Sequence, residues 1–101
     1  MPITVSSRDS VLTVVLSGEI DHHGAREMMT QLDQAIAERL PAQLALDMSG
    51  VTFMDSSGIA VLLRARRQLA HSGGALRVVN IPAQARRVLD AAGIGRLISL
   101  D

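Results

Sequence analysis

A short polar cluster follows the apolar residues 51–54 and consists of Asp55, Ser56, Ser57 and Gly58. Aspartate and serine are favoured N-cap residues, so the cluster is expected to open a helix. The first backbone N–H groups of a helix lack intrahelical partners, and the helix dipole favours negative charge there. A phosphoserine carries about −1.5 to −2 charge, which those free N–H groups could accept without unfolding the chain. A serine that only caps the helix explains the same residues, so both interpretations stay open.

A second polar cluster, within residues 18–24, contains Asp21 and the adjacent His22 and His23. Together with Ser56 these are the residue types of a hydrolase triad, but the sequence has no Gly-x-Ser-x-Gly motif. Adjacent histidines without cysteine or an acidic cluster also make a poor metal site. We therefore expect no catalytic residue, no metal ligand and no cofactor, and we interpret residues 18–24 as a polar loop.

The composition excludes several classes of function. The sequence has no lysine, which rules out a Walker-A lysine, a Schiff-base lysine and the strand lysine of a protein kinase. It has no cysteine, which rules out disulfides, thiolate catalysis and cysteine-based zinc sites. A neutral chain with one aromatic residue is poorly suited to binding nucleic acid, and no apolar stretch approaches the ~20 residues that span a bilayer. We expect a cytoplasmic protein that contacts neither nucleic acid nor membrane.

The formal net charge of zero conceals a division of charge along the chain. Residues 1–50 contain seven acids and three arginines, whereas residues 51–101 contain seven arginines and three acids. The two halves therefore carry net charges of −4 and +4, and Ser56 lies near their boundary. Arg64, Arg67 and His71 fall on one helical face, which we interpret as solvated, with a patch that steers a partner as the alternative.

Hydrophobic periodicity predicts strands and helices that alternate in one domain covering residues 1–101. Apolar runs predict strands at residues 3–5, 11–17, 44–46 and 76–79, and a last short strand or extended tail at residues 97–100. Both faces of residues 11–17 are largely apolar, which suggests a strand covered on both sides. An apolar stripe predicts the first helix, which ends before Pro41; its members are Ala25, Met28, Met29, Leu32, Ala35 and Ile36.

Turn and cap residues complete this outline. Residues 49–50 are a turn signal, Gly73 suits the left-handed end of a second helix, and Pro82 suits the first turn of a third. The third helix is expected to bury Val88, Leu89 and Ala92. The order β-β-α-β-α-β-α-β predicts an α/β fold with a mixed, mostly parallel sheet flanked by helices.

Two segments carry a family resemblance. The sequence Phe-Met-Asp-Ser-Ser-Gly-Ile-Ala-Val-Leu-Leu at residues 53–63 resembles the signature of STAS domains of the anti-sigma factor antagonist family. The sequence Leu-Ser-Gly-Glu-Ile-Asp-His-His at residues 16–23 is similar to a second motif, in the form typical of the sporulation branch, the anti-sigma-F factor antagonists. The order of elements matches that family over nearly the whole chain.

The resemblance implies an anti-anti-sigma factor. In that family, the unphosphorylated antagonist binds an anti-sigma factor that is also a serine kinase, and the sigma factor is released. Phosphorylation by the kinase ends this binding, and a phosphoserine phosphatase restores it. The position phosphorylated in the family corresponds to Ser56, and Asp21 matches an acid near it. With Asp55, Ser57 and Gly58, these residues are expected to contact the partner.

Alternatives and departures remain open. Ser57 is the rival phosphate acceptor, because it also lies in the first turn of the predicted helix. Gly24 stands where relatives often have a hydroxyl residue, and we expect it to weaken the cap of the first helix. The alternative function is a constitutive STAS adaptor or scaffold, in a stress-signalling or lipid-transport complex, that has no phosphoswitch.

Overall fold

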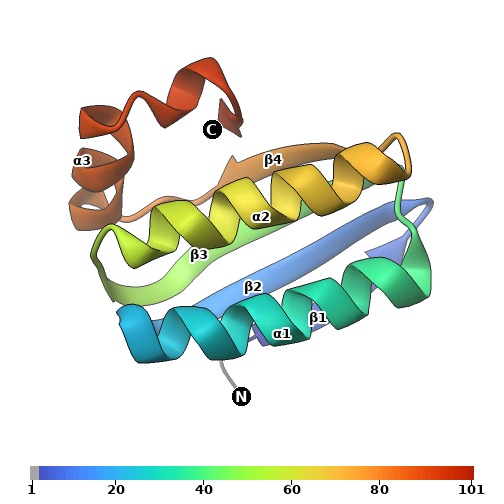
Figure 1. Cartoon of the computed structure of the whole chain (residues 1–101), viewed down its shortest axis with the longest axis horizontal. Helices are drawn as coiled ribbons and strands as arrows, with labels where there is room; N and C mark the ends of the chain where they lie inside the picture. The colour runs from blue at the N-terminus through green and yellow to red at the C-terminus, as the bar shows by residue number, and fades with distance from the viewer. Residues whose placement is uncertain (1–2) are drawn as a thin grey trace.

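The computed structural model describes residues 3–101, in which five strands form one sheet (Figure 1). The elements in chain order are β1 (Ile3–Arg8), β2 (Val11–Ile20), α1 (His22–Arg39), β3 (Gln43–Met54), α2 (Ser57–His71), β4 (Ala75–Val79), α3 (Ala83–Ala91), the 3-10 helix η1 (Ile94–Arg96) and β5 (Ser99–Leu100). The strands lie in the order β1-β2-β3-β4-β5. β1 is antiparallel to β2, and every other neighbouring pair is parallel. The predicted α/β fold with a mixed, mostly parallel sheet is confirmed.

Helices α1 and α2 lie side by side over one face of the sheet (Figure 1). The shortest dimension of the molecule, 19 Å, fits one layer of helices on one layer of strands. On β2, the side chains that point to the helices are fully buried: Leu12, Val14 and Leu16. The predicted stripe of α1 is buried except for Met29, which is partly buried against the same core.

The opposite face of β2 departs from the prediction. Val11, Thr13 and Val15 remain partly exposed, so the expectation of a strand covered on both faces is wrong. β-branched side chains suit a half-buried pleated surface as well as a buried one, which is why the sequence pattern misled here.

Two predicted loops are also part of the sheet or of a helix. β2 continues to Ile20 and α1 begins at His22, so the loop predicted at residues 18–24 is reduced to Asp21. The turn predicted at residues 49–50 lies inside β3, at a shift of register against β2. A bulge accommodates such turn-forming residues without ending a strand.

The ends of the helices follow the glycine signals more closely. Gly73 follows Ser72, the C-cap residue of α2, and has a φ of +76°, as a left-handed helix end requires. In α3, Leu89 is fully buried and Val88 is partly buried, but Ala92 follows the helix and is exposed, so its predicted burial is wrong. No helix within residues 3–101 has the length and apolar character needed to cross a membrane.

An ion pair joins α1 to α2. Arg64 Nη2 lies 2.6 Å from Asp33 Oδ2, and Arg64 Nε lies 3.0 Å from the same oxygen. These hydrogen bonds and the charge of Asp33 raise the pKa of the Arg64 guanidinium. Arg64 keeps 43% of its side chain exposed, as expected of a solvated face, and it also links the two helices that cover the sheet.

Candidate functional site

The two polar clusters of the sequence lie close together, just beyond the C-terminal ends of β2 and β3. β2 and β3 run parallel, and their last residues, Ile20 and Met54, are register partners. Beyond them, the Asp55 backbone N–H donates to the Ile20 carbonyl at 3.2 Å. Asp21 and Ser56 each follow one residue after this hydrogen bond. The starts of α1 and α2 consequently lie at the same end of the molecule (Figure 1).

Asp21 caps α1. Its backbone is extended, and its Oδ1 accepts a hydrogen bond from the Gly24 backbone N–H at 2.8 Å. A Cβ on Gly24 would collide with the Glu19 carbonyl oxygen, so glycine is required by close packing at this position. The expectation that Gly24 weakens the cap is wrong, because the aspartate supplies it.

His22 and His23 form the exposed first turn of α1. Residues 3–101 contain no group of three or more histidine, cysteine or acidic side chains placed to hold a metal ion. Neither histidine forms a hydrogen bond with Ser56 in this part of the chain. The pair therefore lies beside the candidate site without a ligand set or a triad geometry around it.

Asp55, rather than a serine, supplies the cap of α2. Asp55 Oδ1 accepts a hydrogen bond from the Ser57 backbone N–H at 2.8 Å. Ser56 has helical dihedral angles and its side chain makes no cap hydrogen bond. Ser56 is exposed, whereas Ser57 is partly buried. The interpretation of Ser56 as a side-chain cap is therefore wrong, and its hydroxyl group is uncommitted within the described residues.

The N–H groups of the first turn of α2 are already used. Ser57 N–H donates to the Asp55 carboxylate, Gly58 N–H donates to the Asp55 carbonyl at 3.1 Å, and Ile59 N–H donates to the Ser56 carbonyl at 3.1 Å. The expectation that these groups are free to accept a phosphate is wrong. A phosphate on Ser56 would extend into solvent or compete with Asp55 for the Ser57 N–H.

Two residues hold the turn between β3 and α2 in place. A Cβ on Gly58 would overlap Cγ and Sδ of the fully buried Met54, so glycine lets α2 pack against the end of β3. Gln84 of α3 binds the Met54 backbone twice, because Oε1 accepts its N–H at 2.8 Å and Nε2 donates to its carbonyl at 2.7 Å. Nothing in the local sequence around Gln84 indicates a contact thirty positions away, so its role is visible only in the structure.

Three acidic residues lie at or just beyond the C-terminal ends of β2 and β3: Glu19, Asp21 and Asp55. Glu19 is the register partner of Phe53 on the neighbouring strand, and both side chains are exposed. Asp21 and Asp55 are partly buried, and each accepts a backbone N–H at the start of a helix. The C-terminal ends of β2 and β3 therefore carry three acidic residues, one uncommitted serine hydroxyl and one exposed aromatic ring.

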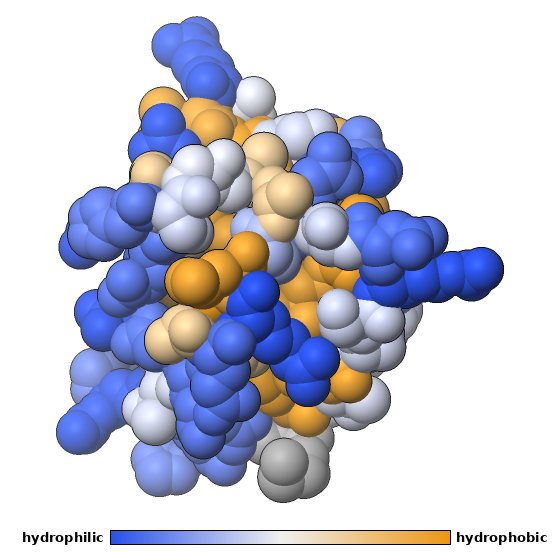
Figure 2. Space-filling model, turned by 90° about the vertical axis from the view of Figure 1, so that its right-hand side faces the viewer, coloured by the Kyte–Doolittle hydropathy of each residue, from blue (hydrophilic) through white to orange (hydrophobic). Residues whose placement is uncertain are grey.

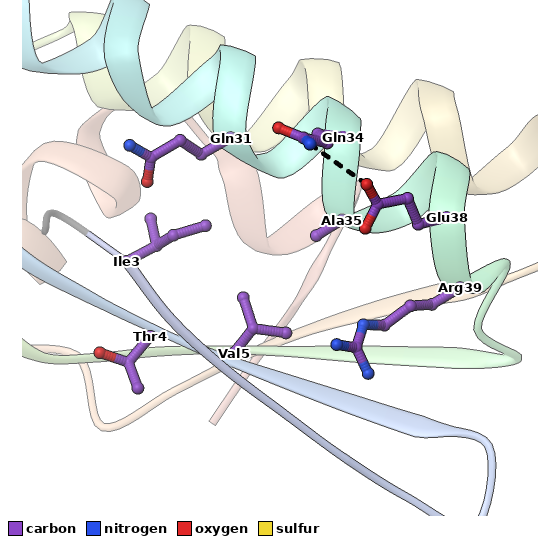
Figure 3. A pocket seen from close by; sticks show the side chains of 8 residues that line it. All are labelled: Ile3, Thr4, Val5, Gln31, Gln34, Ala35, Glu38 and Arg39. Atoms are coloured by element: carbon purple, nitrogen blue, oxygen red, sulfur yellow. Dashed lines mark hydrogen bonds between the residues drawn. The ribbon is translucent and has the colours of Figure 1, made fainter.

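Grooves elsewhere on the surface do not include these residues. One groove, of about 580 Å³, lies between β1 and α1. Among the side chains that line it, Gln34 donates a hydrogen bond to Glu38 (Figure 3). Another, of about 440 Å³, lies between the C-terminal ends of α1 and α2 and is lined in part by Ile36, Leu40 and His71. That end of the molecule faces the viewer in Figure 2, where apolar patches alternate with charged side chains.

Comparison with known proteins gives consistent results over almost the whole chain. The family model for the STAS domain matches residues 2–101. The chain is 32% identical over 100 residues to the anti-sigma F factor antagonist of Paenibacillus polymyxa, covering 99% of this chain and 86% of that protein. It is 26% identical over 98 residues to the anti-sigma-B factor antagonist of Bacillus subtilis, covering 97% of this chain and 88% of that protein.

Solved structures agree with these sequence matches. The crystal structure of an anti-sigma factor antagonist from Mycobacterium paratuberculosis superposes with a TM-score of 0.86 at 28% identity, covering 97% of this chain and 82% of that one. The unphosphorylated anti-sigma factor antagonist SpoIIAA superposes with a TM-score of 0.81 at 23% identity, covering 98% of this chain and 87% of that one. At 23% identity, the likeness to SpoIIAA shows a shared fold.

Proposed function

The chain belongs to the STAS domain family, and from this premise we propose that it is an anti-anti-sigma factor. In its unphosphorylated form it binds an anti-sigma factor that is also a serine kinase, and the bound sigma factor is released. The kinase transfers the γ-phosphoryl group of ATP to Ser56 Oγ, whose proton leaves, and ADP is the other product. The modified chain dissociates, and a phosphoserine phosphatase restores it by hydrolysis. This role is supported by the similarity of the chain to proteins named as anti-sigma factor antagonists.

One observation carries the choice of Ser56. Its side chain is exposed and makes no cap hydrogen bond, because Asp55 accepts the Ser57 N–H instead. A kinase can therefore approach the hydroxyl without breaking a bond that holds α2. Ser57 is partly buried, which makes it the poorer acceptor. The absence of lysine fits a protein that is phosphorylated by a partner, since the partner supplies the grip on ATP.

The proposed switch acts through charge and desolvation. A phosphate on Ser56 adds about −1.5 to −2 charge beside Asp55 and near Asp21, and the N–H groups of the first turn are already paired. A phosphate that moves into an interface therefore loses its bound water, and the backbone N–H groups of this chain do not replace the lost hydrogen bonds. Changing a partner from 99% bound to 99% free requires about 5.5 kcal/mol of differential affinity. We propose that repulsion and desolvation together supply that difference.

Phosphorylation by the anti-sigma factor kinase of the same organism tests this function. We expect intact-mass measurement to show the gain of one phosphate on the wild-type chain and on Ser57→Ala, but none on Ser56→Ala. The phosphorylated chain should then lose binding to the kinase in calorimetry. Phosphorylation that persists in Ser56→Ala and disappears in Ser57→Ala would reassign the acceptor. Binding without any phosphorylation would favour the constitutive adaptor.

A further inference from the structure

Phe53 is the only aromatic residue of the sequence, and 43% of it is exposed. The other large hydrophobic side chains exposed within residues 3–101 are Leu40 and Leu97. Leu40 follows the C-terminal end of α1, opposite the Ser56 end of the helix layer, and Leu97 follows η1 (Figure 1). Phe53 is therefore the large apolar side chain presented beside the candidate site.

A bulge in β3 turns Phe53 outward. Gly18 pairs with Val51, but the next residue of β2, Glu19, pairs with Phe53, so β3 holds one extra residue at this point. Without that residue, Phe53 would be the register partner of Ile20, whose side chain is 1% exposed. The bulge gives that core position to Met54 and leaves Phe53 at the surface. Bulges often re-aim a side chain in this way next to functional sites.

Acidic residues lie near Phe53 at the ends of the two strands. Glu19 lies beside it on the neighbouring strand, and Asp21 and Asp55 follow the ends of the two strands. None of these three carboxylates forms an ion pair with a residue of the described chain. An exposed apolar ring with the exposed carboxylate of Glu19 on the adjacent strand is complementary to an apolar pocket that has a cationic group at its rim.

We infer that Phe53 is the apolar anchor by which this chain docks on its anti-sigma factor kinase, an inference that rests on the proposed function. The ring enters an apolar pocket of the kinase, and arginine or lysine side chains at the rim of that pocket face Glu19 and Asp55. Phe53 and Ser56 are three residues apart, so their Cα atoms are at most about 11 Å apart and one interface covers both. Anchors of this kind dominate the binding energy of an interface, while their surroundings mainly exclude water.

The test compares three variants with the wild-type chain in calorimetric binding to that kinase. Phe53→Ala should raise the Kd by about 30-fold, the loss expected of an interface anchor. Phe53→Leu keeps an apolar side chain of similar size and should recover most of the affinity. Leu97→Ala truncates an apolar side chain of comparable exposure elsewhere on the surface and should bind like the wild type. Thermal unfolding of each variant establishes that the fold is retained.

A second measurement separates docking from chemistry. With the kinase and ATP, Phe53→Ala should raise the KM for phosphorylation of Ser56 and leave kcat near the wild-type value. Wild-type affinity of Phe53→Ala, or an equal loss in Leu97→Ala, would overturn the anchor while the proposed function stands. A wild-type chain that does not bind the kinase would overturn both.

Discussion

Replacing Asp55 by alanine removes the carboxylate that accepts the Ser57 N–H at the start of α2. Loss of an N-cap acceptor costs about 0.5–2 kcal/mol of stability and typically about 1 kcal/mol. Ser56→Ala removes an exposed hydroxyl group that makes no cap hydrogen bond, so it should change the free energy of unfolding by less than about 0.5 kcal/mol. Two neighbouring substitutions are thus expected to differ because only one of the side chains holds the helix.

Urea unfolding followed by far-UV circular dichroism measures this difference, since a chain without tryptophan or tyrosine has no useful fluorescence. A loss of about 1 kcal/mol in a domain of this size lowers Tm by roughly 4–8 °C. Asp55→Asn serves as the matched control: asparagine accepts the same hydrogen bond and ranks with aspartate as a cap, so stability should largely return. If Ser56→Ala costs as much as Asp55→Ala, the hydroxyl is a cap and the case for an uncommitted phosphate acceptor collapses.

The remaining predictions concern packing and pH. Gly58→Ala should cost about 1–3 kcal/mol, because the new Cβ overlaps the side chain of buried Met54, and it should be measured by the same urea titration. Partial burial raises the pKa of Asp47, but hydrogen bonds from Ser49 and Asn80 outweigh burial and hold the pKa below its ordinary 3.8. Because the folded-state pKa is the lower one, this contribution to stability is present above about pH 4 and is lost as the pH falls through the folded value. Asp47→Asn should therefore flatten the acid side of the stability profile.

Controls for both changes lie within the chain. Gly95→Ala adds a Cβ that meets only Leu100 Cδ1, at 3.7 Å, and should cost much less than Gly58→Ala. Equal losses at the two glycines would contradict the packing argument. For Asp47, an acid profile of Asp47→Asn that superposes on the wild-type profile would show that this carboxylate contributes nothing to the acid sensitivity.

Local rules accounted for most of the fold. Helical spacing of apolar residues identified the buried stripe of α1, and Gly73 marked the end of α2 with the left-handed backbone expected of it. The alternation of strands and helices was enough to predict a mixed, mostly parallel sheet, because parallel strands need crossover helices. These features depend on neighbours within a few residues, so a sequence pattern can record them.

Prediction failed where distant segments decide the outcome. The turn expected at residues 49–50 is absorbed into β3, because the register against β2 can take up extra residues as bulges. The ion pair of Arg64 with Asp33 was not foreseen, and neither was the contact of Gln84 with the backbone of Met54. None of these pairings has a local signal, since each joins residues about thirty positions apart.

The sequence by itself determined the order of the elements, the polar clusters at Asp21 and Asp55, and the motifs that resemble the STAS family. Only the tertiary structure decided how those residues are used. The parallel pairing of β2 with β3 brings the clusters together, and Asp55 takes the cap hydrogen bond that either serine could have made. The bulge in β3 then exposes Phe53 and buries Met54. The physical reason is that cap and strand propensities depend on neighbouring residues. Which of several suitable side chains forms the cap, or stays exposed, depends instead on how the strands and helices pack together.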